Sequence, residues 1–217
     1  MQEIGLRTLL IFTTIILTAG LEYLGVKTIS RLTRTKIITL TIIGMAVYGL
    51  LVLNQVNNLW TSNISIIMVS VGIGSTLGTL LNHEVSIMVF LIVSSISDVF
   101  SFFKGFTAAL NTQHLNGGVS YLRYLAITLS FNGLTQWIVG IGDLVIISTA
   151  AFALKKLGYS DWISFLVPLS GLLTGVIFAL FIKQGIPAIP FIATTVIVYL
   201  RFQQGHSLII QTRNLSD

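Results

Sequence analysis

The sequence predicts an all-α polytopic membrane protein, a bundle of about seven transmembrane helices, and three observations support this fold class. Hydrophobic residues make up 54% of the 217 residues, whereas charged residues make up only 9%. Apolar runs close to the length that crosses a bilayer recur along the whole chain. The charged residues cluster in the connections between these runs. A chain of this kind lacks the polar surface that a water-soluble globule needs.

Seven apolar runs are candidate spans. They cover about Leu6 to Leu24, Ile37 to Leu53, Thr61 to Leu81, Val85 to Phe103, Leu134 to Leu154, Trp162 to Ile182 and Pro187 to Phe202. The first run resembles a signal peptide, but its apolar character continues to Leu24, so we expect a retained helix. Short connections and the absence of a repeat or linker indicate one transmembrane domain over 1–217, with N-terminal helices in 1–83 and the helices of the functional site in 84–217.

The exception to the short connections is the polar stretch from Lys104 to Gly133. Its second half, Tyr124 to Phe131, is rich in β-forming residues with partial alternation. We therefore expect a short strand or an amphipathic piece at the membrane surface, beside the functional site. An interfacial helix without a binding role is the alternative.

Composition excludes several classes of protein. The net charge of +5 is small and its carriers flank the apolar runs, which favours contact with membrane lipid and excludes nucleic acid as a partner. The chain has no cysteine, so disulfides and thiolate metal sites are excluded. His83 and Glu84 stand together, but two such side chains at a helix boundary are typical of head-group contacts, so we predict no metal site and no cofactor.

Two further features have structural interpretations. Glu22, near the end of the first span, is expected to extend towards Lys27 at the membrane interface. Gly74 and Gly78 form a small-xxx-small pair, which predicts a helix-packing surface and leaves a homo-oligomer contact open.

Two aspartates lie inside apolar runs, where a charged group is costly and therefore indicates function. The long connection puts one end of both aspartate spans on the same membrane face. If both spans are helical, Asp98 lies about 9 Å from Lys104 and Asp143 about 14 Å from Leu134. The two depths are similar, so the acids can face each other. Such a pair can activate water and donate a proton.

Features next to the acids suit the binding of an extended peptide. Gly140 and Gly142 leave the backbone beside Asp143 bare, which permits the close approach of another chain. A turn of Pro187, Ala188, Ile189 and Pro190 opens the seventh span on the same face, and its prolines remove backbone donors there. Irregular backbone of this kind is tolerated in a membrane where it lines a cavity.

These motifs together resemble one family. An Asp within an apolar helix, a GlyIleGlyAsp sequence in the next span and a ProAlaIlePro turn opening the last span resemble the presenilin and signal peptide peptidase family of GxGD intramembrane aspartyl proteases. Members typically have nine spans, and the seven here resemble the last seven. Ser97 stands where the family usually has Tyr, and Ile189 replaces the Leu of the family's turn.

The resemblance implies a function and a set of site residues. Asp98 and Asp143 would form the catalytic dyad that hydrolyses a transmembrane peptide or a remnant signal peptide. The glycines and the proline-containing turn would bind the substrate. A strand in the long connection would pair with the unwound substrate through Tyr124, Leu125, Ala126, Ile127, Thr128 and Leu129.

Three rival functions stay open. A prepilin or preflagellin peptidase also carries GlyXaaGlyAsp but lacks the proline-containing turn. A proton-coupled transporter also places acids in the membrane, although it predicts an internal repeat that this chain does not show. A catalytically silent protein that grips single helices is the third alternative.

The distribution of basic residues predicts the orientation. Alternate connections place two sets of basic residues on opposite faces. One face has Lys27, Arg31, Arg34, Lys36, Lys155, Lys156, Arg201 and Arg213, and the other has Arg7, Lys104, Arg123 and Lys183. The face richer in Lys and Arg is expected to be cytoplasmic. This places the C-terminus inside and the N-terminus outside, an arrangement that resembles signal peptide peptidases.

Overall fold

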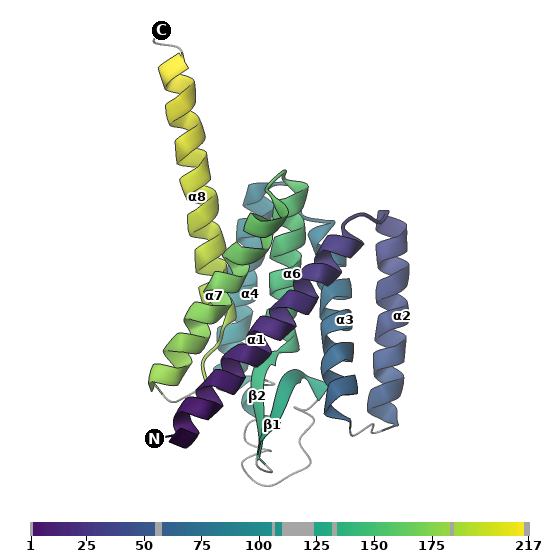
Figure 1. Ribbon diagram of the computed structural model, residues 1–217. Coiled ribbons are helices and arrows are strands. Elements are labelled where there is room, and N and C mark those ends of the chain that lie inside the picture. The colour runs from purple at the N-terminus through teal and green to yellow at the C-terminus, as the bar shows by residue number, and fades with distance from the viewer. Residues whose placement is uncertain are drawn as a thin grey trace.

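The structure is a computed structural model that describes residues 2–54, 58–105, 107–109, 124–131, 134–182 and 185–214. Its elements are α1 (Gln2–Ile29), α2 (Arg34–Leu53), α3 (Leu59–Gly78), α4 (Glu84–Lys104), β1 (Ala126–Phe131), β2 (Leu134–Gly140), α6 (Ile141–Lys156), α7 (Asp161–Ile182) and α8 (Ile189–Asn214). Figure 1 shows the helices running up and down, with the β1–β2 hairpin at the end where the chain begins. The described residues include five helices long and apolar enough to cross a membrane, α1, α2, α3, α4 and α7. The predicted helical class is confirmed, with a small sheet added.

Helix α6 is the centre of the bundle. Leu144 and every residue in 146–154 are buried, and α3, α7, α1 and α8 all contact this helix. In contrast, α2 packs mainly on α3 and exposes most of its apolar side chains. With only 16 residues, α6 is shorter than a typical span.

Gly74 and Gly78 explain the close contact between α3 and α6. A Cβ atom added at Gly74 would lie 2.5 Å from the Cβ of Ser148, and one at Gly78 would lie 2.9 Å from the Cβ of Phe152. Side chains larger than hydrogen therefore cannot be accommodated without movement of the helices. The predicted helix-packing surface is confirmed, and its partner is α6 of the same chain.

The predicted fifth span was wrong in its first third. Residues Leu134–Gly140 form strand β2, which pairs antiparallel with β1, so that Phe131 lies opposite Leu134 and Ala126 opposite Gly140. The run 134–140 is apolar enough to resemble a helix, but its aromatic and β-branched residues also suit a strand, and β1 supplies the hydrogen-bonding partner. The expected strand within Tyr124 to Phe131 is confirmed as β1.

Because 134–140 is a strand, Asp143 lies at a different place in its helix from the one predicted. The helix begins at Ile141, so the aspartate lies in the first turn of α6 and not midway along a longer helix. The depth of about 14 Å from Leu134, calculated for a helix, was therefore also wrong. The polar part of the long connection, 110–123, lies outside the described residues.

The proline-containing turn precedes α8 as expected. The helix begins at Ile189, and Pro190 occupies its first turn, where the absent N–H would have no partner within the helix. A Cβ atom at Gly171 of α7 would lie 2.5 Å from the Cα of Ile192, so this glycine lets α8 begin against α7. The helix continues to Asn214, beyond the predicted end at Phe202.

Candidate functional site

Asp98 lies on α4, half-buried, and contacts the beginning of α8. Its Oδ2 accepts a hydrogen bond from the backbone N–H of Ile189 at 3.1 Å. This N–H is one of the donors at a helix N-terminus that have no partner within the helix. The carboxylate of α4 therefore satisfies the start of α8, and the predicted turn of Pro187, Ala188, Ile189 and Pro190 lies beside the first predicted acid.

Asp143 lies on α6 and folds back on the residue that caps the helix. Its Oδ2 accepts a hydrogen bond from the backbone N–H of Gly140 at 3.1 Å. This is one half of a capping box, since glycine has no side chain to complete it. A Cβ atom at Gly140 would lie 3.2 Å from Oδ2, so glycine leaves room for the carboxylate.

Gly142 differs from Gly140. It is exposed, and a Cβ atom built on it would have no neighbour within 4 Å. The backbone beside Asp143 is therefore accessible on that side, as the sequence predicted.

The fold brings the two aspartates towards each other. Helix α4 packs mainly on α8 and also contacts α6. The carboxyl groups of Asp98 and Asp143 lie within electrostatic range of each other. The site thus combines two acids from different helices with the first turn of α8, and such a pair can activate water and protonate a carbonyl.

The hairpin leads directly into the acid-bearing helix. The N–H of Ile141 donates to the carbonyl of Leu125 at 2.8 Å, which extends the strand pairing into the first residue of α6. Tyr124, Ala126, Ile127 and Thr128 are buried, while Leu129 is half-buried. The predicted strand residues therefore lie next to the helix of Asp143 and face largely into the protein.

Asn63 of α3 already occupies one edge of β1. Its Oδ1 accepts from the N–H of Thr128 at 3.0 Å, and its Nδ2 donates to the carbonyl of the same residue at 2.9 Å. The amide thus imitates a neighbouring strand at this point. In the part of the chain that the structure describes, the sheet has only β1 and β2, so the outer edge of β2 has no strand partner.

Glu22 is a residue whose position the sequence did not reveal. The prediction that it extends towards Lys27 is wrong, because the side chain is 1% exposed and accepts a hydrogen bond from Ser148 Oγ at 2.6 Å. It lies within electrostatic range of Asp143. Lys27 stands instead over the ring of Tyr23, with Nζ 5.6 Å from the centroid. A third acid therefore lies inside the bundle, near Asp143.

Glu84 links three elements. It accepts hydrogen bonds from the hydroxyl of Tyr159 at 3.0 Å and from the side-chain amide of Gln204. The start of α4 is thereby tied to the α6–α7 turn and to α8. Within the described residues, no three side chains of the metal-binding types gather in one place.

Comparison with known proteins returned no matching family model and no matching curated protein.

Proposed function

We propose that the protein is an intramembrane aspartyl protease with Asp98 and Asp143 as its catalytic dyad. The observation that supports this proposal most is that the two carboxyl groups lie within electrostatic range of each other while Asp98 also holds the first turn of α8. The acids come from separate helices of an apolar bundle, and a buried acid in such a setting is costly unless it has a function.

The chemistry needs one carboxylate and one carboxylic acid. Two neighbouring carboxyls in an apolar site cannot easily both be charged, so the pair shares one proton. The charged group takes a proton from water, which attacks the peptide carbonyl. The protonated group donates to the carbonyl oxygen, which gives a gem-diol intermediate. The carboxyl that accepted the water proton then donates it to the peptide nitrogen, while the other carboxylate takes a proton back from a gem-diol hydroxyl. The C–N bond breaks to give a carboxylic acid and an amine, and the pair returns to its starting charge.

A transmembrane helix must unwind before it can be cut, because its internal hydrogen bonds and side chains shield the backbone. Addition of the unwound segment as a strand would compensate for those lost bonds. Since Asn63 occupies β1 at Thr128, the outer edge of β2 is the better partner. Strand β2 ends at Gly140, three residues before Asp143, so this edge leads the peptide to the dyad.

The direct test is incubation of the full-length protein, purified in detergent, with a generic transmembrane peptide. We expect peptide fragments from the wild type and none from Asp143→Asn. Binding of the intact peptide without fragments would indicate a silent helix-binding protein, and the protease proposal would fail.

The buried position of Glu22 supports one second candidate function, that of a proton-coupled transporter. Asp143 lies within electrostatic range of both Glu22 and Asp98, and a series of acids inside an apolar bundle can also form a proton relay. Reconstitution into liposomes with an imposed pH gradient separates the two functions. Proton flux that depends on Glu22, in the absence of peptide cleavage, would favour the transporter.

A further inference from the structure

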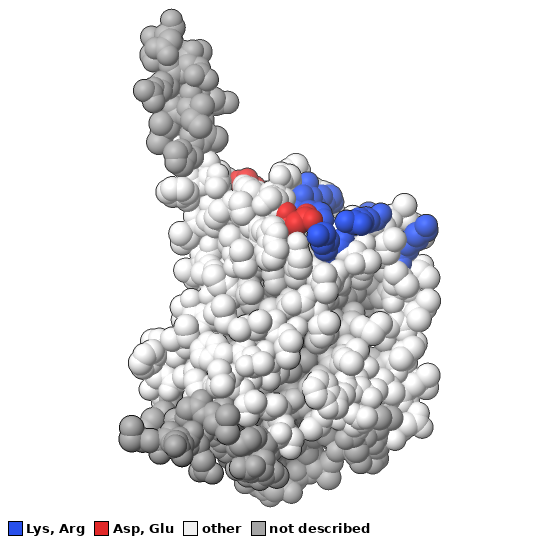
Figure 2. Space-filling view, in the orientation of Figure 1, with Lys and Arg blue, Asp and Glu red and all other residues white. Residues whose placement is uncertain are grey.

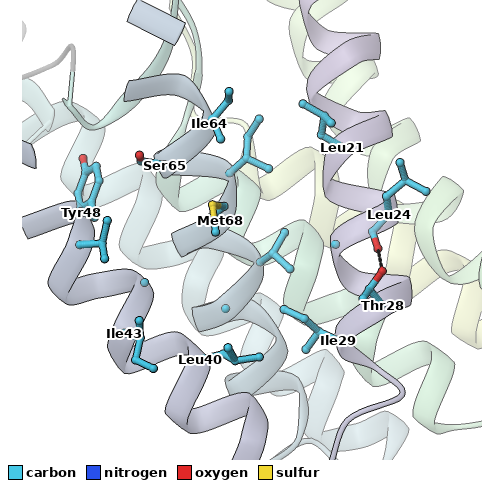
Figure 3. A pocket seen from close by; sticks show the side chains of 16 residues that line it. Leu21, Leu24, Thr28, Ile29, Leu40, Ile43, Tyr48, Ile64, Ser65 and Met68 are labelled. Carbon is cyan, nitrogen blue, oxygen red and sulfur yellow. Dashed lines mark hydrogen bonds between the residues drawn. The ribbon is translucent and has the colours of Figure 1, made fainter. Parts of the chain in front are cut away.

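An apolar groove runs along the bundle between α1 and α2, with α3 as its floor. It has a volume of about 560 Å³, within the range of about 300–1,000 Å³ that ligand sites occupy. Figure 3 shows Leu21 and Leu24 on one wall, Leu40 and Ile43 on the other, and Met68 between them. Leu21, Leu24, Leu40, Ile43 and Met68 are all exposed, so the groove is open to the surroundings of the bundle.

A second cavity, of about 460 Å³, lies where α1 and α6 end and α2 begins, and it is basic. Arg34, Lys155 and Lys156 line it together with Ser30 and Asn82, and no described residue in the lining is acidic. Figure 2 shows Lys and Arg side chains gathered at this end of the molecule.

The charges of this cavity are only partly neutralised by the protein. Lys155 pairs with Asp161 at 2.7 Å, and Lys156 Nζ donates to the carbonyl of Thr79 at 2.7 Å and to the side chain of Asn82. In the described residues, Arg34 and its neighbour Lys36 form no salt bridge. Positive charge therefore remains available to an anion.

The groove and the basic cavity are neighbours that are linked by shared lining residues. A third hollow of about 300 Å³, which Lys36 also lines, shares Leu40 with the groove and Leu32 with the basic cavity. The combined path is apolar along the helices and cationic at their end. This is the pattern of a lipid with an acidic head group.

We propose that this path binds an anionic phospholipid, with the phosphate at Arg34, Lys36 and the Lys155–Lys156 pair and an acyl chain in the groove between α1 and α2. Guanidinium and ammonium groups donate to phosphate oxygens, and basic pockets between transmembrane helices bind acidic head groups. A soluble anion would leave the groove unused, and a zwitterionic lipid would leave the positive charge uncompensated. The site is separate from the aspartates and does not depend on the proposed protease function.

Native mass spectrometry of the full-length protein tests this proposal. The detergent-solubilised protein is mixed with equal amounts of phosphatidylglycerol and phosphatidylcholine, and the bound lipid is identified. We expect preferential retention of phosphatidylglycerol. Arg34→Gln and Lys36→Gln should each lower this retention by about fivefold, whereas Lys104→Gln, at the end of α4, should not. Equal retention of both lipids, or equal loss in the Lys104 control, would overturn the proposal.

Variants at two glycines of α2 test the binding of the acyl chain separately from the binding of the phosphate. A Cβ atom at Gly44 or at Gly49 would have no neighbour within 4 Å, but only Gly44 is among the residues that line the groove. Gly44→Leu should therefore reduce the retention of both lipids, and Gly49→Leu should leave it unchanged. Identical behaviour of the two variants would show that the groove holds no acyl chain.

Two competing ligands distinguish a phospholipid from other occupants of this path. Glycerol 3-phosphate should not displace the phospholipid, and displacement at similar concentrations would assign the site to a soluble anion. A transmembrane peptide should bind equally to the wild type and to Gly44→Leu. Loss of peptide binding with unchanged lipid retention would assign the groove to a protein helix and overturn the lipid proposal.

Discussion

The carboxylate of Asp98 holds the backbone N–H of Ile189 at 3.1 Å, so an acid of α4 fixes the first turn of α8. A single contact thereby joins two sequence motifs that lie 91 residues apart. It also limits where the carboxyl group can point, because one of its oxygens is already engaged.

Asp98→Asn and Asp143→Asn should each lower peptide cleavage by about 10²–10⁴-fold or more, because neither acid alone supplies both base and acid. The double variant should be no worse than either single one, since the two groups act as a unit. Cleavage is measured from fragment yields, and thermal unfolding checks the fold. Asp161→Asn, which changes an acid paired with Lys155 away from the dyad, should cleave at the wild-type rate. Substantial turnover by either dyad variant would contradict the assignment.

Ile189→Pro should reduce cleavage at least about tenfold, because it removes the N–H that orients Asp98. Proline is tolerated at the first position of a helix, so α8 should still form. Ile189→Ala retains the N–H and loses only side-chain packing, which makes it the matched control. Equal rates in the two variants would show that this hydrogen bond does not orient the acid.

Asn63→Leu should destabilise the protein by about 1–3 kcal/mol, because it leaves the buried N–H and carbonyl of Thr128 without their partner. The measurements are thermal unfolding and hydrogen exchange at the Thr128 amide. Thr128→Val serves as the control, since it removes only the hydroxyl contact at 3.4 Å and retains both backbone bonds. If both variants unfold like the wild type, Asn63 does not anchor the hairpin.

Glu22→Gln should leave stability unchanged or raise it by about 1 kcal/mol, because the amide still accepts from Ser148 and carries no charge. Glu22→Leu removes the acceptor and should cost about 1–2 kcal/mol by comparison. Thermal unfolding distinguishes the variants. The pH profile of cleavage should also differ in Glu22→Gln, since this residue lies within electrostatic range of Asp143. A profile that superimposes on that of the wild type would show that Glu22 does not influence the dyad.

The predicted orientation can be tested with introduced cysteines, since the chain has none. Cysteine at position 117, in the long connection, should react with an impermeant thiol reagent on intact cells. Cysteine at position 216, near the C-terminus, should react only after the cells are opened. The excess of Lys and Arg on the face of Lys155 and Lys156 is the physical reason. Labelling at 216 but not at 117 would reverse the orientation and the direction of the substrate.

The sequence was sufficient to put Asp98 and the turn of Pro187 to Pro190 towards one membrane face, because of the order of the spans. The hydrogen bond that joins Asp98 to Ile189 depends on the packing of α4 against α8, which the sequence did not reveal. The sequence was not sufficient to divide the apolar run 134–154 into strand β2 and helix α6. A strand and a helix can both be built from such residues, and the partner that decides is β1, outside the run. The boundary at Gly140 therefore depends on a contact between segments and not on local composition.

The position of Glu22 was hidden for a related reason. Its partner Ser148 lies 126 residues away, and nothing near Glu22 in the sequence indicates that α1 turns this face towards α6. Polar side chains in the middle of α6, Ser148 and Thr149, were the available signal, because hydroxyls in an apolar interior require acceptors. Thr149 donates to the carbonyl of Val145 in its own helix, whereas Ser148 donates to another helix.

The enclosure of α6 has a consequence for the synthesis of this protein. A helix of 16 residues that carries Asp143, Ser148 and Thr149 is poorly suited to stand alone in lipid. Its neighbour α3 is made first and presents the bare surface of Gly74 and Gly78 against which α6 fits. When α6 is made, a complementary surface on α3 is therefore already present, and pairing with it encloses the polar side chains of α6.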